Sequence, residues 1–217
     1  MIQLDNVFKY YKTHGHRKVV LDHISLDFMA GRSYGILGVN GAGKSTMMRI
    51  LGGTELPNSG RLRRNVRVSW PLGFSGGLHP KLTGRENVQF VARLYGENVR
   101  RVTNFVEDFA EIGAYIDVPI MTYSSGMAAR LAFGLSIAID FECYLIDEVT
   151  SVGDAHFARR CKEEFDKRKK KSDVIMISHS MGTLQEYCDR GIVLVGGRVH
   201  IFQNVDDAIE LYKKLNA

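Results

Sequence analysis

The chain contains few of the features that mark secreted or membrane-spanning proteins. It holds three cysteines in 217 residues, and an odd number without a Cys-x-x-Cys pair argues against a disulfide framework. No segment approaches the roughly 18 consecutive apolar residues of a membrane-spanning helix. The first residues lack the basic and apolar segments of a signal peptide. We therefore expect a protein of the reducing cytosol that does not itself cross a membrane.

A large excess of one charge is also missing. The formal net charge is +5, which does not indicate nucleic-acid binding and suits either an anionic membrane surface nearby or a solvated exterior. The same two interpretations apply to a basic cluster on an expected helix, which comprises Arg159, Arg160, Lys162 and residues 167–171. Repeats and low-complexity tracts are absent from the sequence, and its length allows one or two compact domains.

The clearest positive signal is a phosphate-binding loop pattern. A glycine is followed by four residues and then by Gly-Lys-Ser. Its residues are Gly38, Val39, Asn40, Gly41, Ala42, Gly43, Lys44, Ser45 and Thr46. The glycines let backbone N–H groups surround a phosphate, Lys44 can reach the β and γ phosphates, and the Ser45 hydroxyl can bind Mg²⁺. An apolar strand pattern precedes the loop and a helical pattern follows it, as a nucleoside triphosphate site requires.

A second signal is an apolar strand pattern that ends in two carboxylates, Asp147 and Glu148. Asp147 is placed to hold Mg²⁺, and Glu148 to polarise an attacking water. A salt bridge at the strand end would explain the pair equally well if it stood alone. Beside a phosphate loop, the pair predicts nucleotide hydrolysis.

The remaining patterns predict an α/β protein with a parallel core. Strands are expected at 2–11, 19–28, 33–37, 61–70, 141–146, 174–178, 192–195 and 199–202. Residues 82–121 have helical spacing, with one apolar face formed by Val88, Phe90, Val91 and Leu94. A further helix is expected at 125–139. Gly196 and Gly197 predict a two-residue hairpin, and Asn204 a helix cap.

A stretch rich in small residues stands at the start of the helix expected at 125–139. Its residues are Ser124, Ser125, Gly126 and Met127. Such a helix start can bind an anion, although a simple N-cap by either serine is the plainer explanation. His179, after the strand at 174–178, would on its own be read as a packed or surface residue.

In order and spacing these elements resemble the nucleotide-binding domain of ABC transporters, over nearly the whole chain. The resemblance implies one ABC ATPase domain at 1–217: a P-loop core with an N-terminal antiparallel β subdomain at 1–81 and 140–217, and a helical subdomain at 82–139. It implies that Tyr11, or alternatively Tyr10, stacks on adenine and that His179 contacts the γ-phosphate. The resemblance implies that the catalytic residues are Glu148, His179 and Lys44, and that the cofactors are ATP and Mg²⁺.

Residues 123–127 correspond to the family's signature motif and depart from it at Tyr123, Ser125 and Met127. The resemblance implies that Ser124–Met127 closes over ATP bound to a second subunit, so the expected form is a homodimer. A second departure is the stretch 70–77, which lacks the glutamine that the family has at the entry to the helical insert.

Residues 69–72, 82–88 and 123–127 resemble most closely ATPases that export capsule polysaccharides. This implies an ATPase on the cytoplasmic face of the bacterial inner membrane, held there by two copies of a polytopic permease that handles a glycolipid-linked polysaccharide, without nucleic acid. The chain's end at Ala217 leads us to expect no carbohydrate-binding appendage. Alternatives are O-antigen or teichoic-acid-type exporters, ABC ATPases without a transport role, and a small-molecule kinase.

Overall fold

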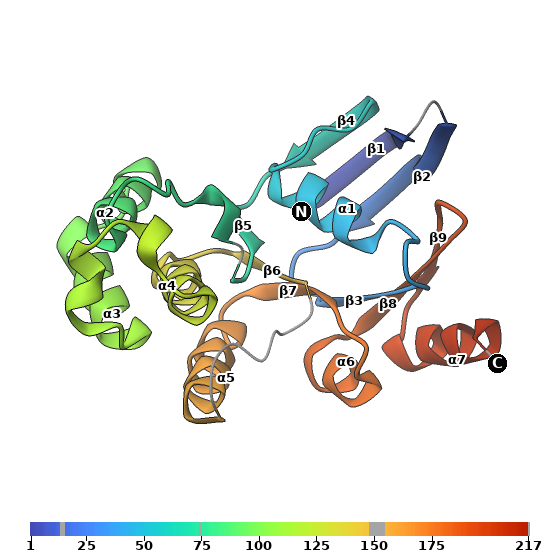
Figure 1. Cartoon of the computed structure of the whole chain (residues 1–217). Helices are drawn as coiled ribbons and strands as arrows, with labels where there is room; N and C mark the ends of the chain where they lie inside the picture. The colour runs from blue at the N-terminus through green and yellow to red at the C-terminus, as the bar shows by residue number, and fades with distance from the viewer. Residues whose placement is uncertain (14–15, 74, 148–154, 217) are drawn as a thin grey trace. The chain divides into compact units, whose positions relative to one another are not determined.

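The computed structural model describes residues 1–13, 16–73, 75–147 and 155–216 (Figure 1). Its internal contacts divide the chain into two units. The first comprises Met1–Pro71, Phe141–Val149 and Ser172–Ala217, and the second Leu72–Asp140 and Thr150–Lys171. The first unit contains the strands and the second is helical.

Six strands of the first unit form a largely parallel sheet in the order β5-β6-β7-β3-β8-β9. Their bounds are β3 Tyr34–Leu37, β5 Val68–Pro71, β6 Cys143–Asp147, β7 Asp173–Ile177, β8 Arg190–Val195 and β9 Arg198–Phe202. Only β9 runs antiparallel to its neighbour. The turn before it is formed by Gly196 and Gly197 at φ 55 and 79, which confirms the predicted hairpin.

Three further strands form an antiparallel sheet in the order β2-β1-β4. They are β1 Ile2–Thr13, β2 His16–Phe28 and β4 Ser59–Arg64. The prediction of one strand at 61–70 was therefore wrong, because this stretch leaves the antiparallel sheet after Arg64 and enters the parallel sheet at Val68. The alternation of apolar residues does not reveal such a change of sheet.

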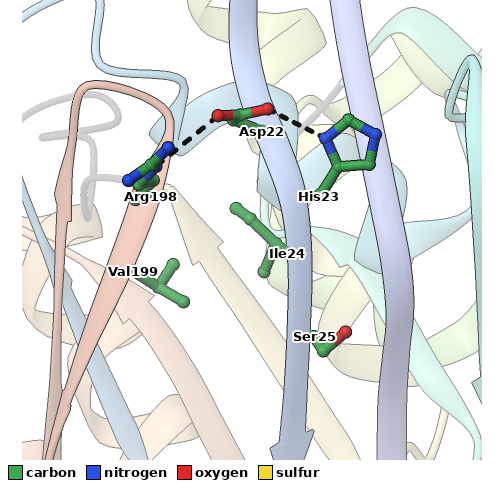
Figure 2. A pocket seen from close by; sticks show the side chains of 6 residues that line it. All are labelled: Asp22, His23, Ile24, Ser25, Arg198 and Val199. Atoms are coloured by element: carbon green, nitrogen blue, oxygen red, sulfur yellow. Dashed lines mark hydrogen bonds and ion pairs between the residues drawn. The ribbon is translucent and has the colours of Figure 1, made fainter.

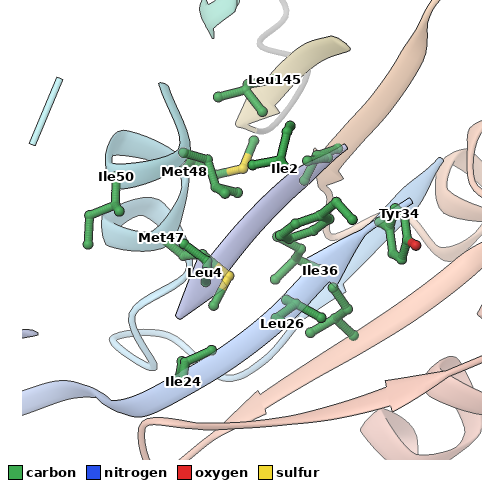
Figure 3. Close-up of a cluster of buried hydrophobic side chains, with 14 of the residues drawn as sticks. Ile2, Leu4, Ile24, Leu26, Tyr34, Ile36, Met47, Met48, Ile50 and Leu145 are labelled. Carbon is green, nitrogen blue, oxygen red and sulfur yellow. The ribbon is translucent and has the colours of Figure 1, made fainter. Parts of the chain in front are cut away.

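Helix α1 (Lys44–Gly52) lies between the two sheets and supplies Met47, Met48, Ile50 and Leu51 to the main core (Figure 3). Ile2 and Leu4 reach this core from β1, and Ile36 from β3. The other face of the parallel sheet is covered by α6 (Met181–Tyr187) and α7 (Val205–Leu215) (Figure 1). Helix α7 begins after Asn204, whose side chain accepts a hydrogen bond from the Asp206 N–H, as the predicted cap requires.

A polar contact ties β2 to the β8–β9 hairpin at the surface of this unit. The Asp22 N–H donates to the Gly197 carbonyl at 2.8 Å, and the Asp22 carboxylate pairs with His23 and Arg198 (Figure 2). The hydrogen bond with His23 lowers the pKa of Asp22. Among the described residues, the open pocket beside this contact is lined by β2 and β9 and by none of the phosphate loop.

The second unit packs its helices around aromatic residues. The helices are α2 Gly84–Leu94, α3 Val99–Ala110, α4 Ser125–Ala138 and α5 Ala155–Lys169, with short 3-10 turns at Ser75–Gly77, Gly113–Asp117 and Ile120–Thr122. Phe109 of α3 contacts the rings of Phe133 and Phe157. Within the described ranges, no helix is long and apolar enough to span a membrane.

The predicted apolar face of α2 was only partly correct. Val88 and Val91 are buried, but Phe90 and Leu94 are 58 % and 68 % exposed. Phe90 and Leu94 are four residues apart and therefore lie together on the solvent side of the helix. Phe90 lies two residues after Val88, and residues two apart in a helix do not face the same side, so Phe90 and Leu94 do not share the buried face of Val88 and Val91. The prediction grouped apolar residues that helical spacing does not bring together.

Candidate functional site

The phosphate loop joins the carboxyl end of β3 to the start of α1, as the motif requires. Its shape depends on glycines that lie against backbone carbonyls. A Cβ on Gly43, whose φ is 108, would stand 2.6 Å from the Val20 oxygen, and one on Gly38 would stand 2.5 Å from the Leu194 oxygen. Only glycine fits at these two positions. The first turn of α1 carries no acidic residue, so its N–H groups can face an anion.

Two lysines lie at this loop. The Lys44 Nζ donates to the carbonyl oxygens of Gly38 at 2.6 Å and Val39 at 3.2 Å. The Lys18 Nζ, from β2, lies 3.5 Å from the point where a Cβ on Gly41 would stand. Nothing in the sequence indicates Lys18, because its proximity to the loop depends on how β2 passes the loop. An anion here would therefore meet two ammonium groups.

Three neighbouring parallel strands bring the other candidates to the same sheet edge. In the order β6-β7-β3, Asp147 is paired with Ile177, and Ile177 with Ile36. Asp147 is half-buried at the end of β6, and His179 is exposed two residues beyond β7. Carboxyl ends of parallel strands are where ligands bind in open α/β sheets.

The donor groups at this edge fit Mg²⁺. The Ser45 hydroxyl is exposed on the first turn of α1, and Asp147 offers carboxylate oxygens, which are the oxygen ligands that Mg²⁺ prefers. No group of three or more His, Cys, Asp or Glu gathers as metal ligands in the part of the chain that the structure describes. Glu148, the predicted general base, lies outside the described residues.

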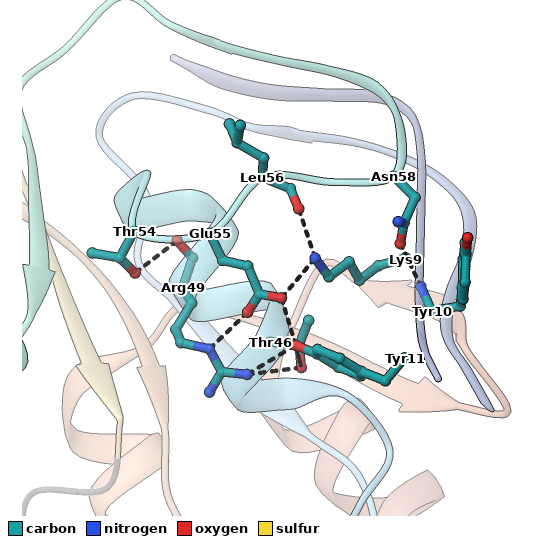
Figure 4. Close-up of polar contacts among 9 residues, drawn as sticks. All are labelled: Lys9, Tyr10, Tyr11, Thr46, Arg49, Thr54, Glu55, Leu56 and Asn58. Carbon is teal, nitrogen blue, oxygen red and sulfur yellow. Dashed lines mark hydrogen bonds and ion pairs between the residues drawn. The ribbon is translucent and has the colours of Figure 1, made fainter. Parts of the chain in front are cut away.

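Tyr11, and not Tyr10, contacts the phosphate loop. The Tyr11 hydroxyl lies 3.2 Å from Thr46 Oγ1, and the ring packs against the main core (Figure 4). The Tyr10 ring instead lies beneath the Arg17 guanidinium, whose Cζ is 3.8 Å from the ring centroid. The Thr46 residue is almost fully buried, and its hydroxyl lies in this contact with Tyr11.

The same hydroxyl belongs to an ionic network that the sequence did not indicate. Tyr11 donates to Glu55 at 2.6 Å, and Glu55 also pairs with Lys9 at 2.7 Å and Arg49 at 2.8 Å (Figure 4). Burial alone would raise the pKa of Glu55, but the hydrogen bonds from Lys9, Tyr11 and Arg49 outweigh burial and lower the pKa to about 2. Glu55 is therefore ionised at neutral pH.

The signature-like residues lie at the start of α4 in the second unit. Ser124 is the N-cap, and its Oγ accepts a hydrogen bond from the Met127 N–H at 3.2 Å. Ser124, Gly126 and Met127 line an open depression together with Glu111, Ile112, Tyr115 and Arg130. The predicted cap is thus present, and Ser124 and Ser125 remain exposed. The Tyr123 hydroxyl donates to the Tyr115 carbonyl at 2.6 Å, which anchors the loop before the helix.

One carboxylate connects three helices around this depression. Glu111, at the end of α3, pairs with Arg130 of α4 at 3.2 Å and with Arg160 of α5 at 2.6 Å. Arg160 also pairs with Asp108. Other members of the basic cluster bond within the unit: Lys167 pairs with Glu164, and Arg168 donates to the Ile137 carbonyl. Part of the charge of this cluster is therefore balanced by carboxylates of the same unit.

Curated relatives match the chain over nearly its full length. The polysialic acid transport ATP-binding protein KpsT of Escherichia coli is 49 % identical over 217 residues, covering 99 % of both chains. The capsule polysaccharide export ATP-binding protein CtrD of Neisseria meningitidis serogroup B is 45 % identical over 215 residues, covering 99 % of this chain and 100 % of CtrD.

The fold has equally extensive counterparts among solved structures. The dimeric post-hydrolysis structure of the ATP-binding cassette MJ0796 bound to ADP and Pi superimposes with a TM-score of 0.75, at 22 % identity, over 94 % of this chain and 99 % of that one. The family model described as ABC transporter matches residues 21–151, more than half of the chain. The chain therefore has the fold of an ATP-binding cassette and belongs to the ABC transporter family.

Proposed function

We propose that the chain is the ATP-hydrolysing subunit of an ABC exporter that moves capsular polysaccharide across the bacterial inner membrane. The observation that carries this proposal is the phosphate loop after β3 at the carboxyl edge of the parallel sheet. His179 follows β7, the strand beside β3, and Asp147 ends β6, the strand beside β7. Similarity to KpsT and CtrD over nearly the entire length of each supports the export of capsule-type glycans. On this basis capsule export is favoured over O-antigen or teichoic-acid-type export.

ATP would bind with its phosphates at residues 38–46. The backbone N–H groups of the loop and the dipole of α1 favour the negative charge, and Lys44 leaves its two carbonyl partners to contact the β and γ phosphates. Tyr11 would support the adenine, because its ring is tied to Thr46 at the end of the loop. Catalysis rests mainly on positioning and on charge neutralisation at the γ-phosphate.

Ser45 and Asp147 would hold Mg²⁺, which neutralises charge on the phosphate oxygens when it is bound. Glu148 would act as the general base that takes a proton from the attacking water. His179, exposed at the same edge, would contact the γ-phosphate from the end of β7. Ser45 lies in the first turn of α1 and Asp147 at the end of β6, so regular secondary structure fixes the backbone that carries each of them.

The active form would be a head-to-tail homodimer in which Ser124, Ser125, Gly126 and Met127 of one subunit cover the ATP of the other. Both serines are exposed, and the N–H groups of the first turn of α4 are suited to an anion. ATP that is contacted by both subunits binds the closed dimer more tightly than the open one and therefore stabilises it. Hydrolysis removes this preference for the closed dimer, so the dimer opens.

The subunit would attach to the cytoplasmic face of the membrane through a polytopic permease, present in two copies. Phe90 and Leu94 give α2 an exposed apolar surface, which is suited to a protein contact. The whole chain would act as one ABC ATPase domain, in which residues 82–139 form the helical subdomain that transmits the opening and closing motion.

The experiment is to purify the chain with its membrane partner and follow Mg-ATP hydrolysis. We expect phosphate to be released free, co-purification with a polytopic membrane protein, and ATP-dependent movement of an anionic capsule-type polysaccharide in proteoliposomes. Transfer of phosphate to an acceptor would show a small-molecule kinase instead. Stimulation by nucleic acid would show an ABC ATPase without a transport role.

Replacing Lys18 by methionine should weaken ATP binding by about 1.4- to 5-fold, because an exposed charge contributes about 0.2–1 kcal/mol. The Lys18 ammonium lies beside Gly41, so the loss should shrink as salt screens the phosphates. Titration of ATP at low and high salt measures both effects. Lys213→Met, on the exposed side of α7, serves as the control, and equal behaviour of the two variants would remove Lys18 from the site.

A further inference from the structure

The network around Glu55 is a closed arrangement within the first unit. Glu55 Oε1 accepts from Lys9 Nζ at 2.7 Å and from the Tyr11 hydroxyl at 2.6 Å, and Oε2 accepts from Arg49 Nε at 2.8 Å. Arg49 Nη2 then donates to the Tyr11 oxygen at 3.1 Å and to Thr46 Oγ1 at 3.2 Å. Figure 4 shows these side chains converging on one point between β1 and the end of α1.

The number of hydroxyl protons shows which group donates in the hydrogen bond between Tyr11 and Thr46. A tyrosine hydroxyl has one proton, and the ionised carboxylate at 2.6 Å is its strongest nearby acceptor. The Tyr11 oxygen can therefore only accept from Thr46, 3.2 Å away, so the Thr46 hydroxyl donates to it. The Tyr11 hydroxyl thus makes three polar contacts, with Glu55, Thr46 and Arg49.

These contacts connect the two ends of the proposed nucleotide site. Thr46 is the last residue of the phosphate-loop motif, and Tyr11 is the proposed support for the adenine. The Tyr11 ring packs against the main core, and its hydroxyl bonds to Glu55 and Thr46. The ribose and the triphosphate chain limit how far the base of ATP can lie from its phosphates, so the protein must place its two contacts within that range.

We propose that Glu55 is a positioning residue that sets the Tyr11 ring at the correct distance from the phosphate loop. The inference rests on the proposed function, and it goes further by assigning a role in base binding to a side chain that does not touch the nucleotide. Two cations share this carboxylate, so its removal leaves Lys9 and Arg49 without their common partner and frees the tyrosine hydroxyl. Phenylalanine at position 11 would keep the ring and lose the restraint.

The test separates the contribution of the base from that of the phosphates. We would measure the dissociation constants of Mg-ATP and of magnesium tripolyphosphate, which carries no base, for the wild type, Tyr11→Phe and Glu55→Gln. We expect both variants to bind ATP about 10- to 100-fold more weakly, as expected for loss of a hydrogen bond to a charged group. Affinity for tripolyphosphate should change by less than about 2-fold, because the phosphate loop itself is intact.

The neighbouring tyrosine provides the matched control. Tyr10→Phe removes the same atom from a ring that lies beneath Arg17, outside the network, and should bind both ligands as the wild type does. The double variant Tyr11→Phe, Glu55→Gln should be no weaker than Glu55→Gln alone, because both changes remove one shared restraint. A simple loss of stability would not change the ratio of the two dissociation constants.

Wild-type ATP affinity in Tyr11→Phe, or an equal loss of both ligands in the variants, would overturn the inference while leaving the proposed function intact. Failure of the wild-type chain to bind either ligand would overturn the proposed function itself. Should Glu55→Gln not fold, Tyr11→Phe still decides the matter, because it removes a single oxygen from a ring that the core continues to hold.

Discussion

Replacing Glu148 by glutamine should slow ATP hydrolysis by about 10²–10⁴-fold, which is the usual contribution of a general base. The amide has nearly the shape of the carboxylate but cannot take a proton from water at neutral pH. ATP binding should persist, because Lys44 and the loop backbone are unchanged. Since ATP stabilises the closed dimer, the variant should accumulate as an ATP-bound dimer, and size-exclusion chromatography with ATP measures this together with steady-state phosphate release.

Glu210→Gln is the matched control for this experiment. Glu210 is exposed on α7, and the same change there should leave both turnover and the monomer–dimer equilibrium as in the wild type. If Glu148→Gln turned over ATP at the wild-type rate, Glu148 would not be the base, and the proton would have to go to another group at the sheet edge.

Replacing Lys44 by alanine should weaken ATP binding by about 10- to 100-fold, because a hydrogen bond to a charged group contributes about 1.5–3 kcal/mol. Hydrolysis at saturating ATP should fall by a further 10²–10³-fold, since the ammonium also stabilises charge that develops in the transition state. Isothermal titration and single-turnover kinetics separate the two effects.

Lys44 also bonds to two carbonyls of its own loop, so loss of loop structure must be distinguished from loss of charge. Lys44→Met retains most of the side-chain stem and the packing and loses the ammonium, and it should behave like Lys44→Ala. Lys213→Ala, at an exposed position on α7, controls for net charge. Tight ATP binding by both Lys44 variants would contradict the assigned role.

The phosphate loop could be predicted from the sequence because all of its parts are consecutive. Gly43, Lys44 and Ser45 need no distant partner to form the start of a helix. The strand that ends at Asp147 was equally visible, since a strand covered on both faces is an uninterrupted apolar run. What the sequence could not provide is the order β6-β7-β3. It places β7, which leads to His179, between the strand that ends at Asp147 and the strand that leads into the phosphate loop.

The parts that were missed depend on contacts between distant residues. Lys9 and Glu55 are separated in the sequence by β2, β3, the phosphate loop and α1, and no local pattern indicates that they pair. Lys18 reaches Gly41 only because β2 passes the loop. The change of sheet between Arg64 and Val68 was missed for the same reason, because hydrogen-bond partners, and not side-chain periodicity, define which sheet a residue joins.

The surroundings of Gly38 and Gly43 restrict how this protein can evolve. Each glycine abuts a main-chain oxygen, one from β8 in the parallel sheet and one from β2 in the antiparallel sheet. A neighbouring side chain could shrink through a compensating mutation, but a carbonyl is present whatever residue carries it. No second-site suppressor that acts by trimming a side chain should therefore rescue alanine at either position, and a selection for revertants should return only glycine.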